Sequence, residues 1–228
     1  MKFSIGSWFG IPVYIHWSLV LFSVVLMAFG VAGGNVGFLL LLFVSILAHE
    51  FGHALMGRKF GIGTREIHLT PMGGVAHMER IPKDPIQEIL VSLAGPAVNF
   101  GIAGITYFVS QGFPEFEWNS MLGAFFWSQI GLGLFNLIPV FPMDGGRILR
   151  SILQVFHDRL KATKISVKLA QVLAVVMGAW GVLNAPMLFF IAIFIWFSAK
   201  RELQIEEKLA WHSKFGPKGA YWDFEVKK

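Results

Sequence analysis

Two histidines four residues apart, with a glutamate between them, form the pattern in this chain that is most able to do chemistry. His49 and His53 flank Glu50 in the segment HEFGH. On a helix, residues four apart lie on one face, so both imidazoles can bind one zinc ion while Glu50 is directed at a water that the zinc activates. The spacing therefore predicts zinc ligands at His49 and His53 and a catalytic carboxylate at Glu50.

The setting of this motif sharpens the prediction. The motif lies near the end of an apolar run, Val36–Met56, and about 20 mostly apolar residues suffice to cross a bilayer. A charged side chain near the centre of such a span costs about 2.5–3.5 kcal/mol, so intramembrane charges usually serve a function. The alternative is a buried helix whose histidines only form hydrogen bonds. The cost favours a zinc hydrolase site inside a membrane.

Composition limits the class of protein. Of the 228 residues, 55% are apolar and only 14% are charged, with a mean hydropathy of +0.61, which is typical of a polytopic membrane protein. The net charge of +5 is spread over loops and forms no single basic face, so we expect no nucleic-acid partner. The chain has no cysteine, which excludes disulfides and a thiol nucleophile.

The apolar segments predict an all-α polytopic membrane protein with about six transmembrane helices. The expected spans are Trp17–Ala32, Val36–Met56, Ile86–Ser110, Met121–Pro139, Ile165–Leu183 and Met187–Ser198. With the N-terminus inside, all 19 Lys and Arg residues fall on the inner side or just within a span there, and the three outer connections carry none. The positive-inside rule then predicts a multi-pass cell-membrane protein with both termini and the active-site face in the cytoplasm.

The remaining segments are more polar. Residues 64–81 form two partly alternating runs joined by a Pro/Gly turn, which predicts a β-hairpin near the active site, and Phe3–His16 could add another short strand. The hairpin edge could pair with an extended substrate segment, or the hairpin could be a covering loop without a substrate role. We expect an intramembrane core at 1–199 and a basic cytoplasmic tail at 200–228, with 213–228 loose or bound to the membrane surface.

Catalytic zinc commonly takes three protein ligands and a water, so a third ligand is needed. Among the four aspartates, Asp144 follows a membrane segment that is interrupted by Pro139 and Pro142, and broken backbone at membrane depth is tolerated where it lines a cavity. The predicted topology brings Asp144 to the same inner side as His49. The alternative is that Asp144 only caps the helix that follows it.

Three segments together resemble the site-2 protease family of intramembrane zinc metalloproteases. They are HEFGH at 49–53, the segment SLAGPAVN at 92–99, and the stretch with Asn136, Pro139, Asp144 and Gly145. The likeness extends over residues 1–200. It implies one zinc ion per chain, bound by His49, His53 and Asp144, with Glu50 as the catalytic carboxylate. It also implies that Asn99 and Asn136 line the cleft and hold the substrate backbone or the oxyanion, although such residues can equally be hydrogen-bonded between helices.

The resemblance implies an endopeptidase that cleaves transmembrane segments of membrane-protein substrates within the lipid bilayer. Some members of the family carry an added PDZ domain or cystathionine-synthase-like modules. We expect neither in this chain, so a separate membrane partner would have to supply regulation.

Two other functions remain open at this point. A divalent-metal transporter could use the same His49, Glu50, His53 and Asp144 cluster as a transient site, although the paired repeats of many carriers are not evident. A catalytically idle scaffold is the other possibility.

We expect ordinary structural roles for several other glycines and histidines. Gly95, Gly101 and Gly104 are expected to let helices approach closely. The other histidines are expected to be polar residues of loops and interfaces, with only the pair His157-Asp158 as a candidate to support the metal ligands; they are His16, His68, His77, His157 and His212.

Overall fold

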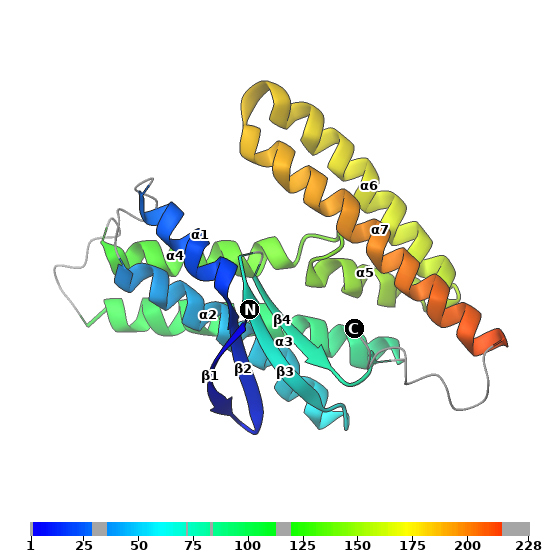
Figure 1. Ribbon diagram of the computed structural model, residues 1–228, viewed down its shortest axis with the longest axis horizontal. Helices are drawn as coiled ribbons and strands as arrows, with labels where there is room; N and C mark the ends of the chain where they lie inside the picture. Colours follow the sequence, from blue (N-terminus) through cyan, green and yellow to red (C-terminus); the bar gives the residue numbers. More distant parts are fainter. Residues whose placement is uncertain (1, 29–35, 72, 83, 113–119, 216–228) are drawn as a thin grey trace. The chain divides into compact units, whose positions relative to one another are not determined.

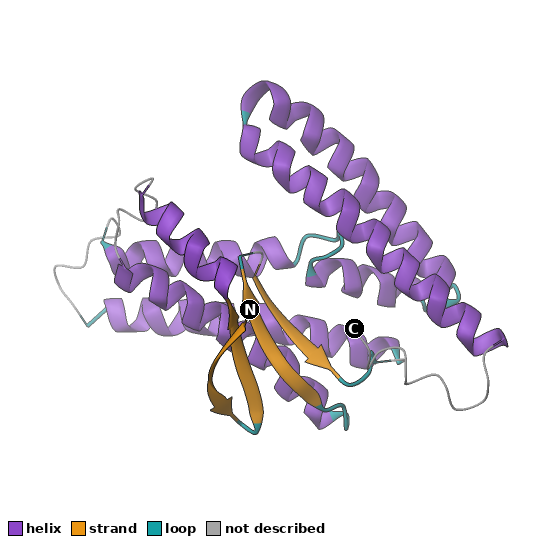
Figure 2. Cartoon of the chain, viewed as in Figure 1, coloured by secondary structure: helices purple, strands orange, loops and turns teal. Residues whose placement is uncertain are grey.

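The computed structural model describes residues 2–28, 36–71, 73–82, 84–112 and 120–215. Helices dominate, and one small sheet lies near the N-terminus (Figure 2). In chain order the elements are β1 (Lys2–Trp8), β2 (Ile11–His16), α1 (Trp17–Ala28), α2 (Val36–Lys59), β3 (Thr64–Thr70), β4 (Gly73–Met78), α3 (Pro85–Ser110), α4 (Met121–Asn136), α5 (Asp144–Leu153), α6 (Arg159–Asn184) and α7 (Pro186–Phe215). The chain forms two units, residues 1–81 with 93–134 and residues 82–92 with 135–228.

The sheet of the first unit is built from two hairpins (Figure 1). Strand β1 pairs antiparallel with β2, β2 pairs parallel with β3, and β3 pairs antiparallel with β4. The predicted hairpin at 64–81 is therefore confirmed, and the N-terminal segment supplies two strands where one was expected. Among the described residues, β1 and β4 are the edges of this sheet.

One face of the sheet packs against α2. Ile11, Val13 and Ile67 point to this face and form a buried cluster with Phe51 and Ala54 of α2. Because side chains alternate along a strand, the neighbouring residues of β2 and β3 point to the opposite face. The burial of apolar side chains on one face thus fixes the sheet beside the half of α2 that carries the HEFGH motif.

Three helices in the described part of the chain are long and apolar enough to span a membrane, namely α2, α3 and α6. They match three of the expected spans. The count of six is wrong for this part of the structure, because α1 has 12 residues and α4 has 16, which is short of a bilayer crossing. Helix α7 has 30 residues, but its second half, from Lys200 onward, contains many charged residues.

The second unit contains α5, α6 and α7. Helices α6 and α7 run side by side as a helical hairpin (Figure 1). Val140, Phe141 and Met143, in the connection that precedes α5, are buried in the same core as Ala170 of α6 and Ala192 of α7. The apolar residues of the Pro-rich interruption are therefore core residues, which holds the start of α5 in place.

A buried ionic cluster also anchors α5. Arg150 is 1% exposed and forms ion pairs with Glu88, with Glu202 at 2.7 Å and with Glu206 at 3.3 Å. Ser151 donates a hydrogen bond of 2.8 Å to Glu88. A buried charge is tolerated only when it is paired, so these contacts fix α5 to the first turn of α3 and to the charged half of α7.

The predicted boundary between a core at 1–199 and a tail at 200–228 stays a prediction. Helix α7 continues through position 200 without a break and ends at Phe215. The expectation for the last residues concerns mainly 216–228, which lie outside the described residues.

Candidate metal centre

Helix α2 brings its two histidines together. His49 and His53 are both buried, and their Nε2 atoms lie 3.0 Å apart. Zinc–nitrogen bonds are about 2.0–2.1 Å, so two nitrogens at this separation can bind the same ion. The predicted pairing of the two imidazoles on one helical face is present in the structure.

A hydrogen-bonded chain of buried amides orients His49. Nδ1 of His49 lies 2.5 Å from Oδ1 of Asn99, which is fully buried on α3. An amide oxygen can only accept a hydrogen bond, so Nδ1 carries the hydrogen and Nε2 keeps its lone pair for a metal. Asn99 in turn donates to Gln129 at 3.0 Å, and Gln129 donates to Ser45 of α2 at 2.9 Å.

Gln129 and Ser45 were not predicted as site residues. The signal that could have found them is a polar residue within an apolar segment, since such residues need a partner inside a membrane. Sequence spacing alone could not show that they are linked, because they lie 84 positions apart.

Glu50 lies between α2 and the edge of the sheet. Its Oε2 accepts a hydrogen bond of 3.2 Å from the backbone N–H of Ala76 in β4. A side chain at Gly74, two residues earlier, would overlap Cγ of Glu50. The sheet edge therefore sets the position of the carboxylate that the sequence identifies as catalytic.

Two glycines make room for the imidazoles. A Cβ at Gly95 of α3 would overlap Nε2 of both His49 and His53. A Cβ at Gly52 of α2 would lie 2.7 Å from the carbonyl oxygen of Ala94. Because Gly95 has no side chain, both imidazoles can lie against α3, and Gly52 lets the two helix backbones approach closely. Gly95 thus has the predicted role of allowing close approach. A Cβ built at Gly101 or Gly104 would meet no atom within 4 Å among the described residues beyond the adjacent turns of α3, so that prediction is wrong for these two within the described structure.

Replacing Gly74 with alanine should reduce cleavage and leave zinc binding intact. The added methyl group displaces Glu50 and does not touch the imidazoles. A shift of about 1 Å in a catalytic group costs on the order of 100-fold in rate. Cleavage by purified Gly74→Ala protein and its bound zinc check this expectation. Val75→Ala, at an exposed neighbouring position, is the matched control and should cleave normally; equal activity of the two variants would contradict the role given to β4.

Asp144 and Asn136 belong to the second unit. Asp144 is the first residue of α5, and the capping position is Met143, so the alternative that Asp144 caps this helix is wrong. Asn136 is the last residue of α4 and is partly buried. Within the first unit, the structure brings together His49, Glu50, His53 and Asn99.

A family model described as Peptidase family M50 matches residues 37–117 and 112–179, and thus covers α2, the hairpin, the buried Asn99 and Asp144. The chain belongs to peptidase family M50. The resemblance to the site-2 proteases that the motifs indicated is confirmed, and the matched residues include every predicted site residue.

Known proteins similar to this M50 chain come from archaea and bacteria. A zinc metalloprotease of Methanocaldococcus jannaschii is 38% identical over 87% of the chain and 59% of its own length. Stage IV sporulation protein FB of Bacillus subtilis is 24% identical over 80% of the chain and 62% of its own length. The solved structure of the site-2 protease from Methanocaldococcus jannaschii is 37% identical, with a TM-score of 0.69 over 89% of this chain and 95% of that one.

These comparisons establish the family and the fold. The chain spans about three-fifths of the length of the curated relatives that it matches. A mostly helical membrane protein with a small sheet is therefore the fold of this M50 chain, in agreement with the elements described above.

Proposed function

We propose that this protein is a zinc endopeptidase that cleaves transmembrane segments of membrane proteins within the bilayer. One observation carries the proposal: Nε2 of His49 and Nε2 of His53 lie 3.0 Å apart against Gly95, where any side chain would overlap both nitrogens. Two imidazoles in such a pair fit a zinc ion, and the neighbouring glutamate supplies the base that a hydrolase needs.

Asp144 is the third ligand in this proposal, with one zinc ion per chain. Two imidazoles and one carboxylate are a common donor set for catalytic zinc, which leaves the fourth position for water. Asp144 lies on a helix whose start is fixed by the buried apolar residues before it and by the ionic cluster around Arg150. A ligand that is held this firmly loses little freedom when it binds an ion.

The chain's own residues perform the proton transfers. Zinc, when bound, supplies a Lewis acid that activates water and polarises the substrate carbonyl. Glu50 takes the proton from the attacking water and returns it to the leaving amine. The hydrogen bond from the Ala76 N–H to Oε2 holds this carboxylate beside the sheet edge, and Asn99 keeps His49 in the tautomer whose Nε2 carries the lone pair that a metal needs.

The edge strand β4 is the proposed docking site for an unwound substrate segment. A peptide bond in a helix is locked by its hydrogen bonds, so the substrate must become extended before it can react. Strand β4 is an edge of the sheet, and its Gly74 and Ala76 contact Glu50. An extended segment that pairs with β4 would regain backbone hydrogen bonds next to the catalytic carboxylate.

The remaining parts of the proposal concern surroundings and partners. The distribution of Lys and Arg supports a multi-pass cell-membrane protein with both termini and the active-site face in the cytoplasm. A separate membrane protein would regulate access to the site. For Asn136, at the end of α4, we retain the proposed contact with the substrate backbone or the oxyanion. Asn99 is assigned to the positioning of His49, because both ends of its amide are already hydrogen-bonded.

The transporter alternative finds no support in the comparisons, since the matching family is a peptidase family and the relatives named above are proteases or a sporulation protein. Metal flux through vesicles that depends on Glu50, without any proteolysis, would revive it.

Replacing Asp144 with alanine should remove the bound zinc. Loss of a partner that only supports a ligand already costs about 10- to 100-fold in metal affinity, so loss of a ligand should cost at least 100-fold. The measurement is bound zinc per chain by mass spectrometry at buffered free zinc. Asp158→Ala is the matched control, because Asp158 caps α6 by accepting a hydrogen bond from the Lys161 N–H. If Asp144→Ala keeps its zinc, Asp144 is not a ligand.

A further inference from the structure

A second group of metal-binding side chains lies on the sheet, separate from the HEFGH motif. Glu66 and His68 are two residues apart on β3, and His77 of β4 is the direct cross-strand partner of Glu66. Residues at i and i+2 and residues directly opposite each other share one face of a sheet. Ile67 and Ala76, the alternate neighbours, pack toward α2, so the three side chains project from the opposite face.

The three side chains converge. The ligand atoms of Glu66, His68 and His77 all lie within 4.8 Å of one another. Nε2 of His68 is 3.0 Å from Oε1 of Glu66, and the rings of His68 and His77 have centroids 4.7 Å apart. We propose that Glu66, His68 and His77 form a second zinc-binding site on the face of the sheet turned away from α2.

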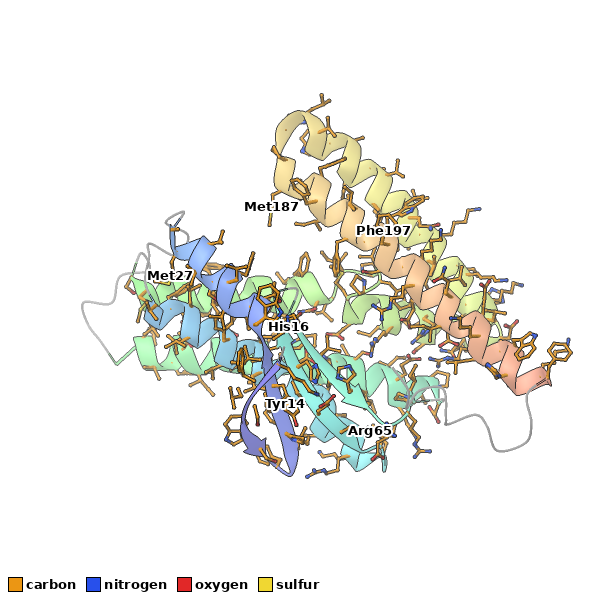
Figure 3. The ribbon with its side chains drawn as sticks, viewed as in Figure 1. Tyr14, His16, Met27, Arg65, Met187 and Phe197 are labelled. Atoms are coloured by element: carbon orange, nitrogen blue, oxygen red, sulfur yellow. The ribbon has the colours of Figure 1, made fainter. Side chains whose placement is uncertain are left out.

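The surroundings hold two of these groups in place. Lys2 binds the other carboxylate oxygen of Glu66, Oε2, at 2.9 Å and lies 4.2 Å above the ring of Tyr14. Tyr14, labelled on the sheet in Figure 3, packs edge-on against His68 with ring centroids 5.5 Å apart. Oε1 of Glu66 therefore stays directed at His68, and the imidazole of His68 is held by an aromatic neighbour.

The donor set selects the kind of ion. Calcium and magnesium are bound by several oxygen ligands, whereas this cluster offers one carboxylate whose charge is shared with Lys2. Two imidazoles and a carboxylate suit zinc, with a water as the fourth ligand. An ion here would join β3 to β4, the strand whose Ala76 donates to Glu50.

Counting zinc ions in the full-length protein tests this site without any measure of proteolysis. The protein is purified in detergent without a polyhistidine tag, stripped of metal and equilibrated at stepped concentrations of buffered free zinc. We expect two zinc ions per wild-type chain and one in the His68→Gln/His77→Gln variant. Magnesium and calcium should not compete for the second ion.

Two further variants supply a control and a test of a single ligand. His16→Gln/His212→Gln removes two histidines outside the cluster and should still bind two zinc ions. Glu66→Gln, which alters a single atom, should raise the free zinc needed for the second ion by about 100-fold, as expected for the loss of a ligand. An ordinary ion-pair cluster would give the same contacts and bind no metal.

The outcomes separate this site from the HEFGH site. A single zinc ion in the wild type that is lost in Asp144→Ala and retained in His68→Gln/His77→Gln would overturn the second site and leave the peptidase proposal standing. A second ion that survives in His68→Gln/His77→Gln would also overturn it.

Discussion

The Glu50→Gln variant should bind zinc as the wild type does and lose cleavage by about 100- to 10,000-fold, the usual contribution of a general acid–base group. Glutamine preserves the size of the side chain and still accepts the hydrogen bond from the Ala76 N–H. It cannot take a proton from water. The measurements are bound zinc per chain and the rate of cleavage of a panel of tagged single-span membrane proteins in liposomes.

The matched control for this variant is Glu79→Gln, which makes the same chemical change at an exposed position of the first unit. It should cleave the panel at the wild-type rate. Full activity of Glu50→Gln would exclude Glu50 as the base. Loss of zinc from Glu50→Gln would show that Glu50 is a ligand, which the proposal does not allow.

The part of the site that sequence could predict is the part that a single helix determines. Residues four apart lie on one face of any helix, so the spacing of His49 and His53 predicts their common face. The apolar run around them predicts the helix itself. The Pro/Gly turn predicted the β3–β4 hairpin for the same local reason. The predicted number of spans is wrong for the described residues because hydropathy does not show where a helix ends: α4 ends at Asn136, before its apolar segment does at Pro139.

The rest of the site depends on contacts between distant segments. Asn99 and Ser45 are linked through Gln129, and the parallel pairing of β2 with β3 joins residues more than 50 positions apart. No periodicity encodes such pairings. His68 and His77 were expected to be ordinary polar histidines, because only the register of β3 with β4 shows that both share a face with Glu66. Sequence also could not separate Gly95 from Gly101, since both follow the same pattern of small residues on α3.

The second large effect is expected at Gly95, the glycine of α3 that lies against the two imidazoles. Gly95→Ala should lose zinc and cleavage together, because its methyl group would occupy the space beside Nε2 of both His49 and His53. We expect zinc affinity to fall by about 100-fold or more, as for the loss of a supporting partner or a ligand. Bound zinc at buffered free zinc and cleavage of the same membrane-protein panel check this expectation.

Gly101→Ala and Gly104→Ala are matched controls on the same helix, where an added Cβ meets no atom of another described segment within 4 Å. Alanine is the better helix former by about 0.8–1.0 kcal/mol, so both controls should keep zinc and unfold no more easily than the wild type. Gly95→Ala has the same gain in helix propensity as the controls. A loss of zinc in this variant alone would therefore come from damage to the metal centre and not from a weaker helix. Wild-type zinc affinity in Gly95→Ala would mean that the two imidazoles do not bind an ion beside this glycine.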